Sequence, residues 1–521
     1  MKKIHYIFFA AALLAAAGCD TFLDKMPDNR AEITTEAQVQ TLLTSAYPDN
    51  DFMLVTEFLS DNIDDMGPTN PYYDRFIEQV VYWKDITETD NESPERIWES
   101  CYAAAAAANE ALQAIDNMGG PTTDGLSAAK AEALLCRAYA HFVLVNVFCH
   151  AYSDQTSSSD LGIPYSTKPE TTLDPKYERS TVAEVYKQID ADIQEALPLQ
   201  ADKYFTVPKY HFNKRAAYSF AARFYLYWQK WDKAEEYAGK CLGTAPETML
   251  RDWEYMTTMT QEYSPLVNHF IDASLNCNLL LMTAYSKMGL AFGPYYLYSR
   301  FTHNNFLAST EGGLATQIWK DAEFFQGMKV YSATNLDKTI FWKLPYLFEY
   351  TDAVAGIGYY RTVYPAFWCD ETLLVRAEAR IHQEKYDDAA ADLTLWMQNI
   401  LDTDEVLDPT YIRRFYNGFS YGTWDNPTIK KQLNAPFDVG TESSIKESML
   451  QCVLGFRRIE TLGQGLRWFD IKRYGIELDR RVMGTDGKPS YVADRLLKDD
   501  PRRAVQIPQK ATDAGMASNP R

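Results

Sequence analysis

Residues 213–243 read NKRAAYSFAARFYLYWQKWDKAEEYAGKCLG, and residues 370–400 read DETLLVRAEARIHQEKYDDAAADLTLWMQNI. Aligned with each other, both stretches carry a small residue in the first half, Ala222 or Ala377, and an aromatic residue near the middle, Trp231 or Tyr386. Small residues let two helices approach closely, and an aromatic ring at the turn fills the wedge between them. Each stretch therefore predicts a pair of antiparallel helices.

The spacing of the small and aromatic positions is that of a tetratricopeptide repeat. Further helices are predicted where capping residues precede apolar positions, as at Ser93-Pro94 and at the capping box Thr181 to Glu184. We expect an all-α fold in which tetratricopeptide-like hairpins form a solenoid scaffold. The repeat-like helices are expected at about 93–150, 181–243 and 368–401.

Two long stretches interrupt this helical pattern, at about 250–365 and 402–440. Both are irregular and rich in Tyr, Trp, Phe and Asn, and loops of this kind between helices commonly carry a binding surface. An alternative is that their rings only cover the scaffold as additional core. The rings that we predict to be exposed and to bind ligand lie in these insertions or in the loop of the 60s to 80s, and they are Trp83, Tyr295, Trp319, Trp342 and Trp424.

The N-terminus has the layout of an export signal. Lys2 and Lys3 precede an apolar run from Ile4 to Ala17, and Gly18-Cys19 follows it. The run is too short for a permanent membrane span, because about 14 helical residues reach only about 21 Å of a core about 30 Å thick. We predict a signal peptide at 1–18, lipidation of Cys19, and a single mature domain at 19–521. The alternative is ordinary secretion with Cys19 incidental.

The net charge excludes one class of partner, and the cysteine spacing indicates the state of the thiols. The chain carries a formal charge of −20, and removing the signal peptide deletes two lysines, so the mature charge is −20 − 2 = −22. Such an acidic chain repels phosphate backbones, so we expect no nucleic-acid partner. Besides Cys19, seven cysteines remain without CxxC spacing, which favours buried thiols, although a Cys136–Cys149 pair stays open.

Three features invite a catalytic or metal-binding interpretation, and for each of them a structural interpretation is favoured. Gly418-Phe-Ser420-Tyr-Gly422 fits a nucleophile elbow, but no histidine follows the serine and no strand precedes it. Asp61, Asp64 and Asp65 could bind calcium or form a glycosidase pair, but Ile63 breaks an EF-hand pattern, and a loop capping backbone amides is favoured. His141 is predicted to be a satisfied core histidine. The sequence thus predicts a protein that is not an enzyme, without cofactor or metal.

Several short motifs follow one another along the chain. They are Cys19-Asp-Thr-Phe22-Leu23-Asp24 with Pro27, Arg137-Ala-Tyr-Ala-His-Phe142 with Val145-Asn146, Gly162-Ile-Pro164, Arg457-Arg458, Glu460, Gly465, Arg467-Trp468-Phe469-Asp470, Arg473, Ile507-Pro508 and Asn519-Pro520. Taken together, these motifs resemble the SusD/RagB family of outer-membrane lipoproteins. The chain departs from the family pattern at Phe456 and Gln464. The arginines and acids of the C-terminal motifs are more typical of a structural lattice than of a reactive site.

The resemblance implies a lipid-anchored protein on the cell surface that captures nutrient glycans, or peptides in some members, without catalysis. It also implies a partner, a TonB-dependent outer-membrane transporter of the SusC type, over which the protein acts as a lid. Members bind sugars mainly through aromatic platforms, which suits the aromatic insertions. Two alternatives remain: an exported repeat scaffold that binds proteins or peptides, and, with least support, a glycoside hydrolase.

Overall fold

The computed structural model describes residues 33–67, 70, 72–170, 176–333 and 336–521. The predicted signal peptide and Cys19 lie outside these residues. One continuous hydrophobic cluster includes residues from Val39 to Ile507. This cluster supports the single-domain organisation, which stays a prediction.

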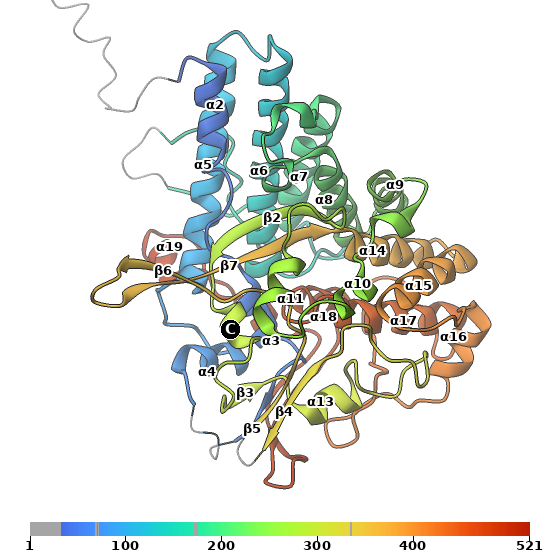
Figure 1. Cartoon of the computed structure of the whole chain (residues 1–521). Coiled ribbons are helices and arrows are strands. Elements are labelled where there is room, and N and C mark those ends of the chain that lie inside the picture. The colour runs from blue at the N-terminus through green and yellow to red at the C-terminus, as the bar shows by residue number, and fades with distance from the viewer. Residues whose placement is uncertain (1–32, 68–69, 71, 171–175, 334–335) are drawn as a thin grey trace, which may run out of the picture.

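The paired helices expected from the sequence are present. In Figure 1, α5 and α6 stand side by side, with α7, α8 and α9 beyond them and α14 and α15 on the right. Ser93 caps α5 with Pro94 in its first turn, and Thr181 and Glu184 form the predicted capping box of α7. That the hairpins stack as a regular tetratricopeptide-like solenoid stays a prediction. The bounds are α2 (Glu36–Leu43), α5 (Pro94–Asn117), α6 (Asp124–Phe148), α7 (Val182–Ala196), α8 (Lys214–Tyr227), α9 (Trp231–Leu242), α14 (Cys369–His382) and α15 (Tyr386–Ile400).

The prediction of an all-α fold is wrong in part, because small sheets are present. The first insertion supplies most of their strands, so it is not irregular throughout. The sheets have the orders β3-β1-β8-β9, β2-β7-β6 and β4-β5. Their strands are β1 (Asp64–Asp65), β2 (Asn278–Tyr285), β3 (Phe301–Thr302), β4 (Lys329–Ala333), β5 (Leu336–Ile340), β6 (Leu347–Asp352), β7 (Ile357–Trp368), β8 (Leu478–Met483) and β9 (Pro489–Leu496).

Short helices connect these parts and close the C-terminal side of the molecule. The β6–β7 hairpin extends away from them as an arm at the left of Figure 1. The short helices are α3 (Met53–Leu59), α4 (Arg75–Val81), α10 (Trp253–Thr257), α11 (Tyr263–Phe270), α12 (Met288–Ala291), α13 (Asn305–Thr310), α16 (Pro409–Tyr416), α18 (Arg467–Arg473) and α19 (Gln509–Asp513), and the longer helix α17 (Ile445–Glu460) lies among them in the chain. The 3₁₀ turns are η1 (Leu197–Leu199), η2 (Asp202–Tyr204), η3 (Pro208–Tyr210), η4 (Pro246–Met249) and η5 (Pro501–Arg503).

Helix α6 is the central helix of the core. It is the one helix among the described residues that is long and apolar enough to cross a membrane, but its apolar stretch is entirely buried inside the protein. Arg137 on this helix forms a buried ion pair with Asp192 of α7, with 2.6 Å between Nη2 and Oδ1. Every face of the helix can be buried, because most of its side chains are apolar and the charge of Arg137 is paired.

Buried cations satisfy the ends of several helices. The ammonium of Lys472 donates to the carbonyl oxygens of Asn146 and Cys149, 2.7 and 2.6 Å away, at the end of α6. Lys343 binds the last carbonyls of α17, and Arg480 donates to Phe58, Leu59 and Ser60 at the end of α3. The last carbonyls of a helix lack partners within the helix and carry partial negative charge, so a cation there supplies both a donor and the opposite charge.

Candidate ligand-binding site

Two of the five predicted ligand-binding rings lie in the core, so the expectation that they are exposed is wrong. Trp83 is 3% exposed, and its indole N–H donates to the carbonyl of Leu59 at 2.9 Å, while the Arg480 guanidinium lies over its ring. Trp319 is 4% exposed and packs against Phe456. Neither ring offers a face to a ligand, and we do not propose them further.

The other three predicted rings are partly exposed. Trp342 packs edge-on against Tyr263, with the ammonium of Lys329 over its face. Trp424 lies in the second insertion, at a distance along the chain from the other two. Tyr295 packs against Tyr346, with their ring centres 5.0 Å apart. Of the three, Tyr295 adjoins a larger group of rings, and the role of all three stays a prediction.

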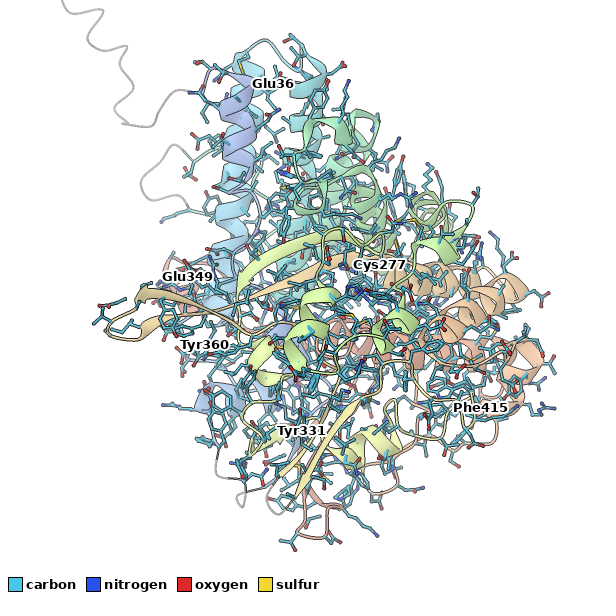
Figure 2. All side chains as sticks on the ribbon, in the orientation of Figure 1. Glu36, Cys277, Tyr331, Glu349, Tyr360 and Phe415 are labelled. Atoms are coloured by element: carbon cyan, nitrogen blue, oxygen red, sulfur yellow. The ribbon has the colours of Figure 1, made fainter. Side chains whose placement is uncertain are left out.

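Tyrosines from three separate segments gather on one face of the molecule. We call the set Tyr72, Tyr295, Tyr296, Tyr346 and Tyr360 the tyrosine face. Tyr72 precedes α4, Tyr295 and Tyr296 lie between α12 and β3, and Tyr346 and Tyr360 belong to the base of the β6–β7 arm. Figure 2 labels Tyr360 where that arm meets the body.

The rings of the tyrosine face form a continuous aromatic surface. Tyr72 and Tyr296 are stacked, with ring centres 4.2 Å apart and planes 15° from parallel. They are 40% and 38% exposed. The phenol of Tyr296 interacts with those of Tyr72 and Tyr360, and the ring centre of Tyr360 in turn lies 5.9 Å from that of Tyr346. Flat exposed rings of this kind stack on the apolar faces of sugars.

The backbone that presents Tyr296 is strained. Its φ is +46°, in the left-handed region that a residue with a side chain rarely adopts. Such a conformation costs about 1–3 kcal/mol and tends to occur where function requires it. Below the stacked pair, a cavity of about 60 Å³ is lined by apolar side chains that include Phe58, Leu290 and Phe301.

Polar groups surround the aromatic surface. Arg300 lines the same cavity and donates to both carboxylate oxygens of Asp65 at 2.8 Å. Lys287 and Asp74 also line it, and Asp74 caps the first turn of α4. Partial burial raises the pKa of Tyr72 and of Tyr296 above the ordinary phenol value, so both hydroxyls stay neutral at neutral pH. Neutral hydroxyls and charged groups at the edge can bind sugar hydroxyls.

Sequence reasoning found one member of this face, Tyr295, and missed the others. A signal was present, because the chain contains three Tyr-Tyr pairs, at 72–73, 295–296 and 359–360. Each pair contributes a ring to the face. What the sequence lacked was any indication that segments hundreds of residues apart meet there.

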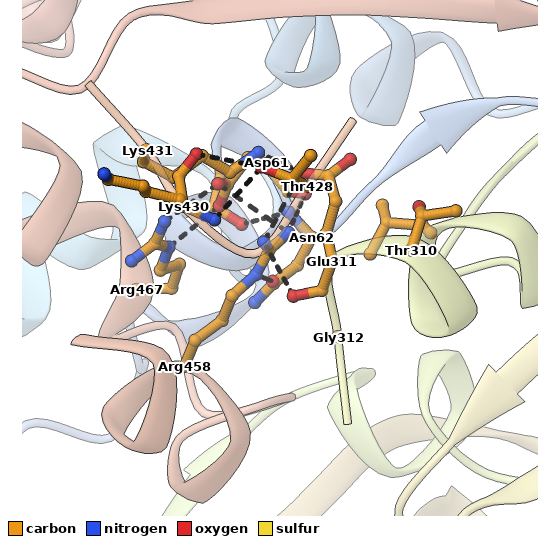
Figure 3. A network of polar contacts seen from close by, with 12 residues as sticks. Asp61, Asn62, Thr310, Glu311, Gly312, Thr428, Lys430, Lys431, Arg458 and Arg467 are labelled. Carbon is orange, nitrogen blue, oxygen red and sulfur yellow. Dashed lines mark hydrogen bonds and ion pairs between the residues drawn. The ribbon is translucent and has the colours of Figure 1, made fainter. Parts of the chain in front are cut away.

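The acidic loop of the 60s binds arginines, which corrects the expectation that it mainly caps backbone amides. Asp61 accepts from Arg467 at 2.9 Å on each oxygen, and Figure 3 shows it enclosed by Arg458, Arg467 and Lys431. Burial opposes ionisation of Asp61, but Arg458 and Arg467 outweigh it and hold its pKa well below the usual range. A permanently ionised, paired carboxylate cannot act as a general acid, so this network is structural.

The same structural character holds for Asp64 and Asp65, the two other acids of this loop. Asp64 pairs with Arg481, with 2.9 Å between Oδ1 and Nε. Asp65 pairs with Arg300 and accepts from the backbone N–H of Gly67. Within the described ranges, no group of three or more His, Cys, Asp or Glu residues could hold a metal ion.

The structure confirms three predictions about the placement of single residues, namely Ser420, His141 and the cysteines. Ser420 is exposed in a loop after α16 and does not lie on a strand-to-helix turn. His141 is fully buried, with Nδ1 at 2.8 Å from the carbonyl of Arg137 and Nε2 accepting from the N–H of Ser166 at 3.0 Å. The seven cysteines that the structure describes are buried free thiols.

A second hollow lies between α5 and α19, with a volume of about 270 Å³. Trp98 and Tyr177 line it, but Trp98 is 9% exposed because it packs into the core against Tyr102 and Phe148. Lys510 at the rim forms ion pairs with Glu95 and Glu99, with 2.7 and 2.9 Å between its Nζ and their carboxylate oxygens. The tyrosine face is the stronger site, because its rings are exposed and stacked.

One family model matches the N-terminal part of the chain. Residues 21–226 match a family model described as SusD-like_3, starch-binding associating with outer membrane. No curated protein matches the sequence.

Solved structures show the same fold over nearly the whole chain. A SusD superfamily protein from Bacteroides thetaiotaomicron is 16% identical with a TM-score of 0.59, covering 94% of this chain and 100% of that one. A SusD-like carbohydrate binding protein from Bacteroides vulgatus is 16% identical with a TM-score of 0.62, covering 92% and 96%. A SusD superfamily protein from Bacteroides fragilis is also 16% identical with a TM-score of 0.62, covering 93% and 99%. The N-terminal part of this chain is therefore similar to the SusD-like family model, and the chain as a whole shares the fold of these SusD superfamily structures.

Proposed function

We propose that this protein binds glycans at the bacterial outer membrane and captures them on the tyrosine face without cleaving them. The observation that carries the proposal is the exposed, stacked pair of Tyr72 and Tyr296 above an apolar cavity. The description of the matching family, starch-binding and associating with the outer membrane, supports the ligand class and the location. The arginine-paired state of the acidic loop argues against a glycosidase pair there.

The finer parts of the proposal concern anchoring and delivery. We propose that Cys19 carries a lipid that holds the protein at the cell surface, and that the bound oligosaccharide passes to a SusC-type TonB-dependent transporter. The sequence layout at 1–19 and the resemblance to the SusD/RagB family support these parts. Tyr295, Trp342 and Trp424 remain proposed as additional contacts of longer glycans.

Replacing the two stacked rings is expected to abolish most glycan binding. Purified protein is first screened against plant, host and microbial polysaccharides to find one that binds. Each ring contributes on the order of 1 kcal/mol, so Tyr72→Ala or Tyr296→Ala should weaken binding about 5- to 10-fold, and the double variant more. The melting temperature should change little, because both rings are more than one-third exposed. Calorimetric titration with a melting curve measures both quantities.

A control and a contrary result complete this test. Tyr255→Ala removes another tyrosine, 53% exposed on α10, and should leave affinity unchanged. Unchanged affinity in the Tyr72 and Tyr296 variants would reject the tyrosine face. Binding of a partner protein but of no glycan would favour the scaffold function, and release of shortened products from the bound glycan would favour a hydrolase.

Co-purification with a large outer-membrane barrel is expected if the transporter is the partner. Permanent interfaces commonly bury more than about 2,000 Å² and survive mild detergent. The tether and the first helical hairpin, α5 with α6, are the proposed contact region. Gentle solubilisation of membranes that also contain the neighbouring transporter, followed by size-exclusion chromatography, measures the complex. Recovery of monomer alone in repeated preparations would count against this partner.

A further inference from the structure

The strained loop that carries Tyr296 is held in place by a lysine from another part of the chain. Residues 286–300 connect β2 to β3 and contain the short helix α12. Lys338 lies on β5, opposite Tyr331 of β4, and is 2% exposed. Its side chain extends into this loop and not into solvent.

The ammonium of Lys338 binds two carbonyl oxygens of the loop. Nζ lies 2.9 Å from the oxygen of Gly293 and 2.8 Å from that of Tyr295. No carboxylate forms an ion pair with this ammonium in the part of the chain that the structure describes. Burial therefore lowers the pKa of Lys338 to about 7. Burying an ammonium without a counter-ion costs free energy, because the charge loses its hydration. The two hydrogen bonds to carbonyl oxygens offset part of this cost.

The contact with Tyr295 determines how Tyr296 is presented. The Tyr295 carbonyl belongs to the peptide unit that joins Tyr295 to Tyr296. The orientation of that unit about the N–Cα bond of Tyr296 is the φ angle of Tyr296, which is +46°. A donor that fixes this carbonyl thus stabilises the left-handed backbone and directs the ring onto Tyr72.

Two neighbouring contacts restrict the first part of the same loop. The hydroxyl of Tyr263 lies 2.9 Å from the carbonyl oxygen of Gly289. Gly293 packs so closely that a Cβ atom there would lie 2.2 Å from the same carbonyl oxygen. The segment from Gly289 to Gly293 is therefore fixed by other contacts. The peptide between Tyr295 and Tyr296 is the part of the loop whose orientation depends on Lys338.

We propose that Lys338 is a positioning residue for ligand binding, which holds Tyr296 in the strained conformation that completes the tyrosine face. The inference rests on the proposed function for its binding readout, but its structural part can be measured without any glycan. It assigns a specific role to a residue that contacts no ligand itself.

Lys338→Met tests the proposal, because methionine is of similar size and cannot donate a hydrogen bond. We expect backbone hydrogen exchange in residues 293–299 to rise about 10-fold or more. Glycan affinity should fall about as much as in Tyr296→Ala, by about 5- to 10-fold. Combining Lys338→Met with Tyr296→Ala should lower affinity little beyond either single variant, because both remove the same positioned ring.

Lys472→Met is the matched control. Lys472 is 8% exposed, binds two carbonyl oxygens at 2.7 and 2.6 Å, and has its pKa lowered by burial to about 7, but it lies at the end of α6. Lys472→Met should lower the melting temperature and speed hydrogen exchange around residues 146–150, while glycan affinity stays within twofold of the wild type.

Three outcomes would overturn the proposal. They are unchanged exchange at 293–299 in Lys338→Met, equal losses of affinity in both lysine variants, and fully additive losses in the double variant. If Lys338→Met does not fold, Lys338→Gln, which keeps an N–H donor on a shorter side chain, is measured in the same way. If the wild type binds no glycan, the proposed function fails, and the exchange comparison still decides whether Lys338 holds the loop.

Discussion

Arg457→Met is expected to lower the free energy of unfolding by about 3–5 kcal/mol, because it leaves a buried negative charge without compensation. The Arg457 guanidinium pairs with Asp470, Glu371 and Glu378 at 3.0, 3.3 and 3.5 Å, and all four side chains are 0% exposed. Arg223 and Arg473 also contact these acids, so the variant would hold three carboxylates against two cations.

The pH dependence of this loss distinguishes a charge effect from a packing effect. In the variant, the uncompensated carboxylate should have its pKa raised by burial. A group whose pKa is raised on folding contributes its full stabilisation at pH values below its pKa in the unfolded state. This contribution is lost as the pH rises through the pKa that the group has in the folded state. The deficit relative to wild type should therefore be larger at pH 8 than at pH 5. Denaturant unfolding at both pH values measures it.

Arg495→Met is the matched control for a surface ion pair. Arg495 pairs with Asp479 at 3.0 Å, but its side chain is 58% exposed. Exposed pairs contribute about 0–1 kcal/mol, so this variant should stay within about 1 kcal/mol of the wild type. Similar losses in the two variants, or a deficit in Arg457→Met that does not depend on pH, would contradict the assigned role of the buried cluster.

Cys19→Ala is expected to release nearly all of the protein from the membrane fraction. The proposed attachment depends on one thiol, and an acyl chain contributes about 0.8 kcal/mol for each buried CH₂, so its loss removes the anchor. Labelling with palmitate followed by membrane fractionation measures attachment and location together. Cys452→Ala, which removes a buried thiol of α17, should change neither quantity. A Cys19 variant that still carries label and still sediments with outer membranes would contradict the lipidation prediction.

Helices could be predicted from the sequence because their signals are local. Ser93 with Pro94, and Thr181 with Glu184, cap backbone groups within three residues of themselves, and they begin α5 and α7 as predicted. The two aligned stretches likewise gave α8 with α9 and α14 with α15. The family resemblance also came from short motifs, and the comparisons support it.

Strands were missed because their partners are distant. β2 pairs with β7, so residues 278–285 acquire their hydrogen bonds from residues 361–368. Most of β2 is buried, so its run LLLM lacks the alternation that marks a half-exposed strand. The first insertion therefore resembled irregular chain although it contains most of the sheet strands.

The exposure of single rings was also decided by tertiary structure. Trp83 lies in a segment without helical period, yet it is buried because the Arg480 guanidinium covers its ring from almost 400 residues further along the chain. Trp319 is covered in the same way by Phe456. The absence of periodicity says that a residue is outside a regular helix, and it does not say that the residue faces solvent.

The sequence by itself determined the helical pairs and the net negative charge of the chain. Local hydrogen bonding, side-chain spacing and composition are sufficient for these properties. Only the tertiary structure decided which rings form a surface, because Tyr72, Tyr296 and Tyr360 come from three segments and meet through long-range contacts. It alone also placed Lys338 under the Tyr295 carbonyl, where a buried ammonium can hold a strained backbone that no local sequence pattern encodes.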